Sequence, residues 1–176
     1  MEFNYEIKIP QERIAVLLGV KGSVKKKIEK LLKLKMNIDS EEGVINLSGD
    51  DGLNLLTGQN IVKAIGRGFN PEVAIELANE DNHLEILDIT EYTGDSKKKF
   101  TRIKARVIGE GGKARKYIEE LTETKIVIYG KTVSIIGNYE YVNLARRAFE
   151  GLLSGQRHST IYAWLEKNMK NKKYLI

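Results

Sequence analysis

The chain has 176 residues, of which 41% are hydrophobic and 30% are charged, a composition typical of globular domains rather than of a disordered protein. It contains no cysteine, which excludes disulfides, thiol catalysis and thiolate metal sites. No apolar run approaches the length of a membrane span, and the charged, alternating N-terminus is unlike a signal peptide. We therefore expect a cytoplasmic protein that needs no metal or other cofactor.

Positive charge is concentrated in the second half of the chain. Residues 1–90 hold 11 Lys or Arg and 15 Asp or Glu, whereas residues 91–176 hold 18 and 9, so that the net charges are −4 and +9. A basic half beside an acidic half favours a polyanionic ligand that binds mainly to the second half. Ordinary surface lysine would give a similar sum, so charge alone does not decide.

Apolar periodicity predicts the same order of elements twice. In the first half, period-two alternation predicts strands, apolar residues three or four apart predict helices, and Ser23 is the expected N-cap of the second helix. The order is β-α-α-β-β-α. The elements expected there are a strand over 3–9, helices over 14–18 and 23–33, strands over 36–38 and 44–47, and a helix over 53–65.

The second half repeats this order after a connecting segment. Residues 69–83 lack Gly/Ser runs and include a short helical stretch, which indicates a structured linker. We therefore expect a first domain over 1–68 and a second over 84–176. The expected elements are a strand over 84–89, a basic loop over 93–99, a short helix over 103–108, a helix over 114–121, strands over 126–128 and 133–135, a closing helix over 142–152, and an amphipathic tail over 158–173 that packs on the second domain.

A Gly-x-x-Gly motif stands at the same place in both halves. Residues 19–39 align without gaps on residues 109–129, and the shared positions include both glycines, one glutamate (Glu29 and Glu119) and the apolar helix face. Such a glycine pair allows a sharp turn and a close approach of another chain, and a helix that begins after it favours a phosphate. The coincidence of motif and register indicates a two-domain repeat.

The order β-α-α-β-β-α with Gly-x-x-Gly between the first two helices resembles the KH (K-homology) domain of type I topology. The resemblance covers nearly the whole chain and implies an α+β fold of two tandem KH domains, each a three-stranded sheet packed on helices, plus a C-terminal helix. In the KH mode, the glycine loop clamps the backbone of about four single-stranded nucleotides while the bases lie in an apolar groove.

The second half also resembles a narrower group, the small-subunit assembly factor Partner of Nob one and its archaeal relatives. The similarity lies in residues 106–113, 118–122, 125–127 and 135–137, in the linker segment 66–74, and in the Gly155-x-x-His158-x-x-Ile161-Tyr162 pattern of the tail. It implies binding of small-subunit ribosomal RNA near its 3′ end during ribosome maturation. The same resemblance implies a possible protein partner such as an rRNA-processing endonuclease, and we expect a monomer.

The candidate RNA-binding residues follow from the two glycine loops and the basic positions around them. The apolar groove would have Ile14, Leu17, Leu18 and Ile38 as its floor in the first domain, and Val107, Ile108 and Ile128 in the second. The full set of candidate RNA contacts is Gly19, Val20, Lys21, Gly22, Ser23, Lys25 and Lys26 in the first domain, and Arg106, Ile108, Gly109, Glu110, Gly111, Gly112, Lys113, Arg115 and Lys116 in the second.

Two alternatives stay open. Glu110 puts an acidic side chain in a loop that should hold a phosphate, and KH-like folds can lose RNA binding, so a protein-docking scaffold is one alternative. An RNA-processing enzyme is the other, although the two histidines are far apart in sequence and outside any ligand or acid-base cluster. We expect no catalytic residues.

Overall fold

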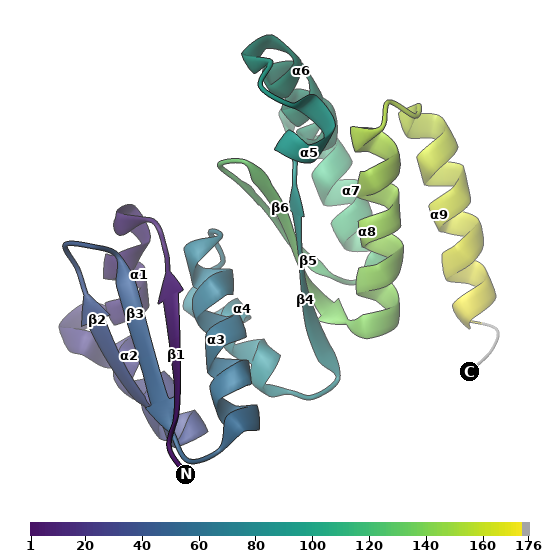
Figure 1. The fold of residues 1–176 in the computed structure, drawn as a ribbon. Helices are drawn as coiled ribbons and strands as arrows, with labels where there is room; N and C mark the ends of the chain where they lie inside the picture. Colours follow the sequence, from purple (N-terminus) through teal and green to yellow (C-terminus); the bar gives the residue numbers. More distant parts are fainter. Residues whose placement is uncertain (174–176) are drawn as a thin grey trace. The chain divides into compact units, whose positions relative to one another are not determined.

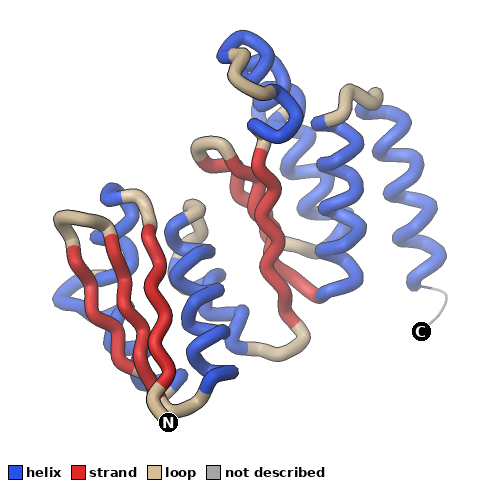
Figure 2. The backbone as a smooth tube through the Cα atoms, viewed as in Figure 1, coloured by secondary structure: helices blue, strands red, loops and turns tan. Residues whose placement is uncertain are grey.

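A computed structural model describes residues 1–173, and the chain divides into two units after Asn82. Figure 1 traces the chain from purple to yellow, and Figure 2 separates helices from strands. The first unit contains β1 (Phe3–Lys8), α1 (Ile14–Leu18), α2 (Ser23–Leu32), β2 (Lys35–Asp39), β3 (Val44–Gly49) and α3 (Gly52–Gly66). This is the expected order β-α-α-β-β-α.

The sheet of the first unit is antiparallel in the order β1-β3-β2, so that β2 is an edge strand. Alternation dictates this packing, because Ile7, Met36 and Leu47 turn to the core while their polar neighbours stay exposed. Asp51 begins α3 as its N-cap by accepting hydrogen bonds from the amides of Leu53 and Asn54. The helix then covers β1 and β3.

The segment after α3 is helical, and it packs on α3. It forms α4 (Pro71–Ala74) and a 3-10 turn over Ile75–Ala78. Arg13 fixes the approach to this segment, because its guanidinium donates to the carbonyls of Ile65 at 2.8 Å and Phe69 at 3.0 Å. Residues 71–78 thus add a layer to the first unit.

The second unit has the same order, with a short helix inserted after its first strand and another helix added at its end. Its elements are β4 (Asn82–Asp88), α5 (Thr90–Thr93), α6 (Lys97–Ile108), α7 (Lys113–Thr122), β5 (Lys125–Tyr129), β6 (Thr132–Asn138), α8 (Tyr139–Leu153) and α9 (His158–Lys173). The sheet order is β4-β6-β5, which makes β5 the edge strand that corresponds to β2. The two three-stranded sheets and their helices confirm the expected α+β class.

The prediction of a basic loop over 93–99 was wrong. α5 ends at Thr93, and α6 begins at Lys97 and runs for 12 residues, so that it is twice as long as the short helix expected over 103–108. Ser96 caps α6 by accepting a hydrogen bond from the amide of Lys99. The run of lysines hid this helix, because its apolar stripe of Phe100, Ile103 and Val107 begins only in the second turn.

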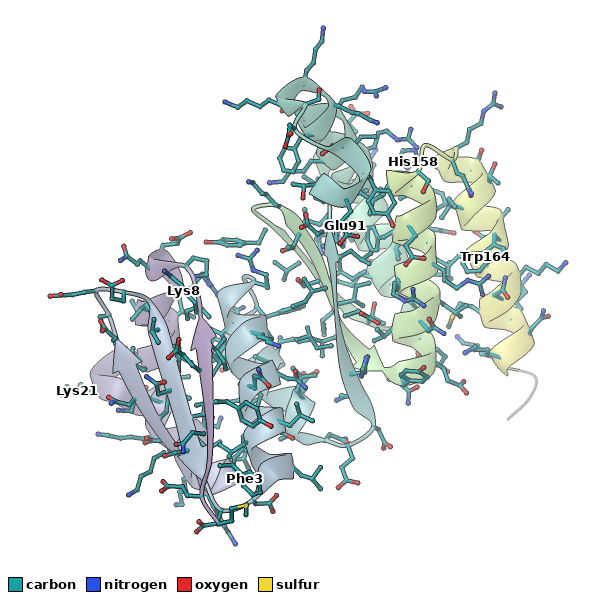
Figure 3. All side chains as sticks on the ribbon, viewed as in Figure 1. Phe3, Lys8, Lys21, Glu91, His158 and Trp164 are labelled. Carbon is teal, nitrogen blue, oxygen red and sulfur yellow. The ribbon has the colours of Figure 1, made fainter. Side chains whose placement is uncertain are left out.

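The tail forms α9, as predicted. Ile161, Leu165 and Met169 lie four residues apart and are buried with the core of the second unit. Trp164 packs against the same core while the Arg147 guanidinium lies 4.9 Å from the centre of its ring. His158 is the first residue of α9, as expected, and both it and Trp164 are labelled in Figure 3. Within residues 1–173, no helix has the length and apolar content that crossing a membrane would require.

Candidate nucleic-acid interface

The two glycine loops have nearly the same backbone. Gly19 has φ +71° and Gly109 φ +77°, and the last glycines, Gly22 and Gly112, are left-handed with φ +73° and +79°. In each loop the amide of the last glycine donates to the carbonyl of the first, at 3.2 Å and 3.1 Å. The repeat therefore holds at the level of individual backbone dihedral angles.

The first and last glycines of each loop are needed for different reasons. A Cβ on Gly109 would lie 2.7 Å from the Cβ of Ala114, and one on Gly19 would lie 2.6 Å from Cγ2 of Val24. A Cβ on Gly112 would meet nothing within 4 Å. The first glycine lets the loop close on the following helix, whereas the last leaves open space in front of the backbone.

The residues between the glycines project outward. Val20 is 81% exposed, and Lys21 adopts the left-handed conformation (φ 53°) that Gly111 adopts in the second loop (φ 60°). Figure 3 shows where Lys21 lies on the first unit. Glu110 is exposed and has room to turn away from a bound anion.

The expectation that Ser23 is an N-cap was wrong. α2 begins at Ser23 and has Gly22 at its N-cap position, and α7 has Gly112 there, in both cases with no side-chain cap. The left-handed glycine moves each cap one residue towards the loop. The positive end of the helix dipole therefore faces the open space in front of the last glycine.

The apolar positions expected in the groove separate into two classes. Ile14, Leu17 and Val107 are at most 5% exposed and belong to the cores. The half-buried members are the ones that remain accessible to a ligand, namely Leu18 and Ile38 in the first unit and Ile108 and Ile128 in the second.

The edge strand that follows the second helix of each unit offers backbone groups to a ligand. The amide of Met36 in β2 donates to Glu29 at 2.9 Å, and the amide of Ile126 in β5 donates to Glu119 at 2.7 Å. These amides point away from the sheet. Because outward and inward groups alternate along an edge strand, Ile38 and Ile128 direct their N–H and C=O to the same outer edge.

Arg115, expected to contact phosphate, lies beside this edge. Its Nη1 donates to Glu119 at 3.2 Å and to the carbonyl of Ile126 at 3.3 Å, so that it neutralises the glutamate that holds β5. Sequence comparison of the two halves pointed to the shared glutamate, but it gave no indication that the glutamate would bridge a helix to a strand.

Arg106 is not brought together with the glycine loop. Its guanidinium donates through Nη2 to the carbonyl of Gln156, in the turn between α8 and α9, and its own carbonyl accepts from Nε2 of His158 at 2.8 Å. Sequence spacing placed Arg106 near Gly109, but the helical turn between them sends its side chain to the α8–α9 turn.

The lysines expected to contact phosphate lie near the loops and differ in their exposure and in their contacts. Lys26 reaches back over its loop, with Nζ 3.5 Å from the carbonyl of Lys21, and Lys25 is half-buried. Lys113 and Lys116 are exposed on the first turn of α7. Lys104, which sequence reasoning missed, donates to the carbonyl of Gly130 at 2.7 Å and ties α6 to the β5–β6 turn.

Comparisons with known proteins agree with this geometry. A family model described as a eukaryotic type KH domain (KH domain type I), for the second KH domain of PNO1, matches residues 83–170. A KH domain-containing protein of Methanocaldococcus jannaschii is 44% identical over 171 residues, which cover 95% of this chain and 74% of that protein. The pre-rRNA-processing protein PNO1 of Candida albicans is 27% identical over 89% of this chain, which spans 59% of that protein.

Solved structures are similar over nearly the whole chain. Dim2p from Pyrococcus horikoshii has a TM-score of 0.86 and 41% identity, over 94% of this chain and 99% of that one. The chain matched in the a/eIF2alpha-aDim2p-rRNA complex of the same organism has a TM-score of 0.89 and 41% identity, over 97% and 96% of the two chains. The matched family model, the identity to the archaeal relative and the glycine loop between α6 and α7 lead to one conclusion: the chain belongs to the PNO1-type family of KH-domain proteins.

Proposed function

We propose that this chain is a non-catalytic RNA-binding protein that holds single-stranded small-subunit rRNA near its 3′ end during ribosome maturation. The observation that carries the proposal is the open, left-handed glycine at the N-terminus of α7, beside an edge strand with outward backbone groups. The names of its relatives support the choice of RNA, since the Candida albicans protein is a pre-rRNA-processing protein and the Pyrococcus horikoshii complex contains rRNA.

In this proposal both units are KH domains. The second unit matches the family model, and the first has the same element order, the same sheet order and the same loop dihedral angles. Its loop keeps the open Gly22 and adds Lys21, a cation that the second loop lacks. These features support a first unit that also clamps a nucleotide backbone.

Binding proceeds without a chemical step. The phosphates lie against the loop amides and the first turn of α7, where Lys113 and Lys116 add charge. The bases lie over Ile108 and Ile128, and the outward backbone groups of Ile128 pair with a base edge. Glu110 turns to solvent, and the cations of α7 offset its charge.

A second candidate role is protein docking by the first unit. Phe3 on β1 and Leu53 and Leu56 on α3 are 38%, 76% and 48% exposed, so these side chains offer apolar surface to a partner. The Pyrococcus horikoshii complex holds a/eIF2alpha together with rRNA, which supports a protein partner. An rRNA-processing endonuclease is another candidate partner. We still predict that the protein is a monomer and that it is cytoplasmic.

Fluorescence anisotropy with single-stranded oligomers from the 3′ end of small-subunit rRNA, over a series of salt concentrations, tests the proposal. We expect wild type to bind and affinity to fall steeply with salt. The variant Gly111→Asp/Gly112→Asp removes the second cradle, and Val20→Asp/Lys21→Asp alters the first. Loss in the first variant alone would make the second unit the RNA reader and leave the first for protein docking. Loss in both indicates a tandem clamp, and no binding by wild type overturns the proposal.

A further inference from the structure

A basic cavity lies on the face of α6 that is turned towards the α8–α9 turn. It has a volume of about 290 Å³ and is lined by Tyr92, Lys99, Arg102, Ile103, Arg106, Leu153, Ser154 and Gly155. Its three cations are spaced three and four residues apart, so they form one stripe on α6. Among these described lining residues none is acidic.

Arg106 is held in place and has a donor to spare. His158 donates to its backbone carbonyl, and the Gln156 carbonyl accepts from one terminal nitrogen of its guanidinium. Its Nε is fully buried and has no hydrogen-bond partner within the described residues. A buried N–H of a charged group without an acceptor is costly, so the guanidinium brings uncompensated positive charge to the wall of the cavity, where a bound anion would stabilise it.

The other walls of the cavity suit a small anion. Gly155 has φ +94°, and a Cβ on it would meet nothing within 4 Å, so the turn stays open on its outer side. Burial, and then the charges of Glu150 and Glu91, raise the pKa of Tyr92 above its ordinary value, so its hydroxyl keeps its proton and can donate. Arg146 pairs with Glu150 at 2.8 Å and so compensates that carboxylate.

We propose that Lys99, Arg102 and Arg106 bind a phosphate group of the RNA backbone, outside the short segment that the glycine loop holds. The inference rests on the proposed function for the identity of the polyanion. Arg106 and Arg102 lie three and seven residues before Gly109, which is about 5 and 10 Å along α6. A strand that leaves the loop can reach the cavity within a few nucleotides. The Gly155-to-His158 part of the tail pattern then serves to hold Arg106.

Two double variants with equal loss of charge test the assignment. Lys99→Gln/Arg102→Gln empties the cavity of its free cations and leaves Arg106 in place, whereas Lys167→Gln/Lys170→Gln removes two exposed lysines of α9. Anisotropy is measured with rRNA 3′-end oligomers of four and of about ten nucleotides. We expect the cavity variant to bind the longer oligomer about tenfold more weakly, with a salt slope smaller by about 0.7 because one phosphate contact is lost. The shorter oligomer and the α9 variant should bind as wild type does.

A second readout does not depend on RNA. Inorganic phosphate added to the isotope-labelled protein should shift the Nε–H resonance of Arg106 saturably, and the cavity variant should weaken that shift. An unmoved resonance overturns the site, as does an equal loss of affinity in the two double variants. A phosphate-dependent shift with unchanged RNA affinity overturns the assignment to RNA and leaves a free-anion site. Failure of the glycine-loop variants to change RNA binding would instead overturn the proposed function, and the phosphate titration distinguishes the two failures.

Discussion

The carboxylate of Glu119 in α7 accepts a hydrogen bond from the backbone amide of Ile126 in β5 at 2.7 Å. The same bond joins Glu29 to Met36 in the first unit at 2.9 Å. In each unit the helix after the glycine loop ends in a left-handed residue, Lys33 or Glu123, before the chain enters the edge strand. The glutamate therefore ties the helix after the glycine loop to the edge strand.

Removing this carboxylate should destabilise the second unit. Glu119→Ala leaves the Ile126 amide without its acceptor and Arg115 without its ion pair, at a cost of about 1–3 kcal/mol in the free energy of unfolding. Urea unfolding measures the change. Glu119→Gln keeps an acceptor oxygen and should lose less, and Glu120→Ala, at an exposed position, serves as the reference. Equal effects of Glu119→Ala and Glu120→Ala would show that the bridge contributes nothing.

The two glycines of the second loop should separate stability from binding. Gly109→Ala puts a Cβ 2.7 Å from that of Ala114 and should lower the midpoint of urea unfolding clearly. Gly112→Ala meets no neighbour and costs only the left-handed conformation, about 1 kcal/mol. Gly112→Asp should fold comparably but bind RNA more weakly. If Gly112→Asp unfolded as readily as Gly109→Ala, the division of roles would be wrong.

A side chain at Gly151 should loosen the tail. A Cβ there would lie 2.3 Å from Cδ1 of Ile161, at the point where α9 packs on α8. Gly151→Val should therefore cost about 1–3 kcal/mol through overpacking. Limited proteolysis should then cleave within α9 sooner than in wild type, while Ser154→Ala, at an exposed position, leaves the rate unchanged. If Gly151→Val were cleaved at the wild-type rate, the contact between α8 and α9 would accommodate the larger side chain and the prediction would be wrong.

The contact between α7 and α9 should depend on alkaline pH. The hydrogen bond from the Tyr117 hydroxyl to Glu166, followed by burial and the charge of Glu166, raises the pKa of Tyr117 to about 12. Since the folded pKa lies above the unfolded value, this stabilisation is complete below about pH 10 and is lost as pH rises towards 12. Ultraviolet titration of tyrosinate and urea unfolding at several pH values measure it. Tyr117→Phe should remove that pH-dependent component, and a titration of Tyr117 at its ordinary pKa would contradict the bond.

Periodicity and glycine spacing were enough to predict most of the backbone. The element order and the packing of α9 follow from apolar residues two, three or four apart. The start of α6 did not follow, because Lys97, Lys98 and Lys99 give no apolar signal and only the Ser96 cap marks it. Capping residues such as Ser96 determine where a helix begins, and apolar periodicity, which is read over several turns, does not detect them.

The position of the two candidate loops in the fold was predicted from the sequence, whereas the partners of the individual side chains were not. Gly112 and Lys113 lie where their spacing requires, since the backbone dihedral angles fix them. Arg106 and Arg115 were grouped with them by proximity in sequence. In the structure, Arg106 donates to the Gln156 carbonyl and Arg115 pairs with Glu119. A long side chain can reach a partner on another element, and distance along the sequence does not predict which partner it reaches.

Lys21 and Gly111 share one left-handed conformation although only glycine adopts it without cost. The loop thus keeps its shape whichever residue occupies this position. A duplicated segment that kept its backbone conformation while its surface side chains changed would show this combination. The constant offset of ninety residues between the two loops fits such a duplication. The two loops could then evolve different charges, and hence different preferences for RNA, without either having to be refolded.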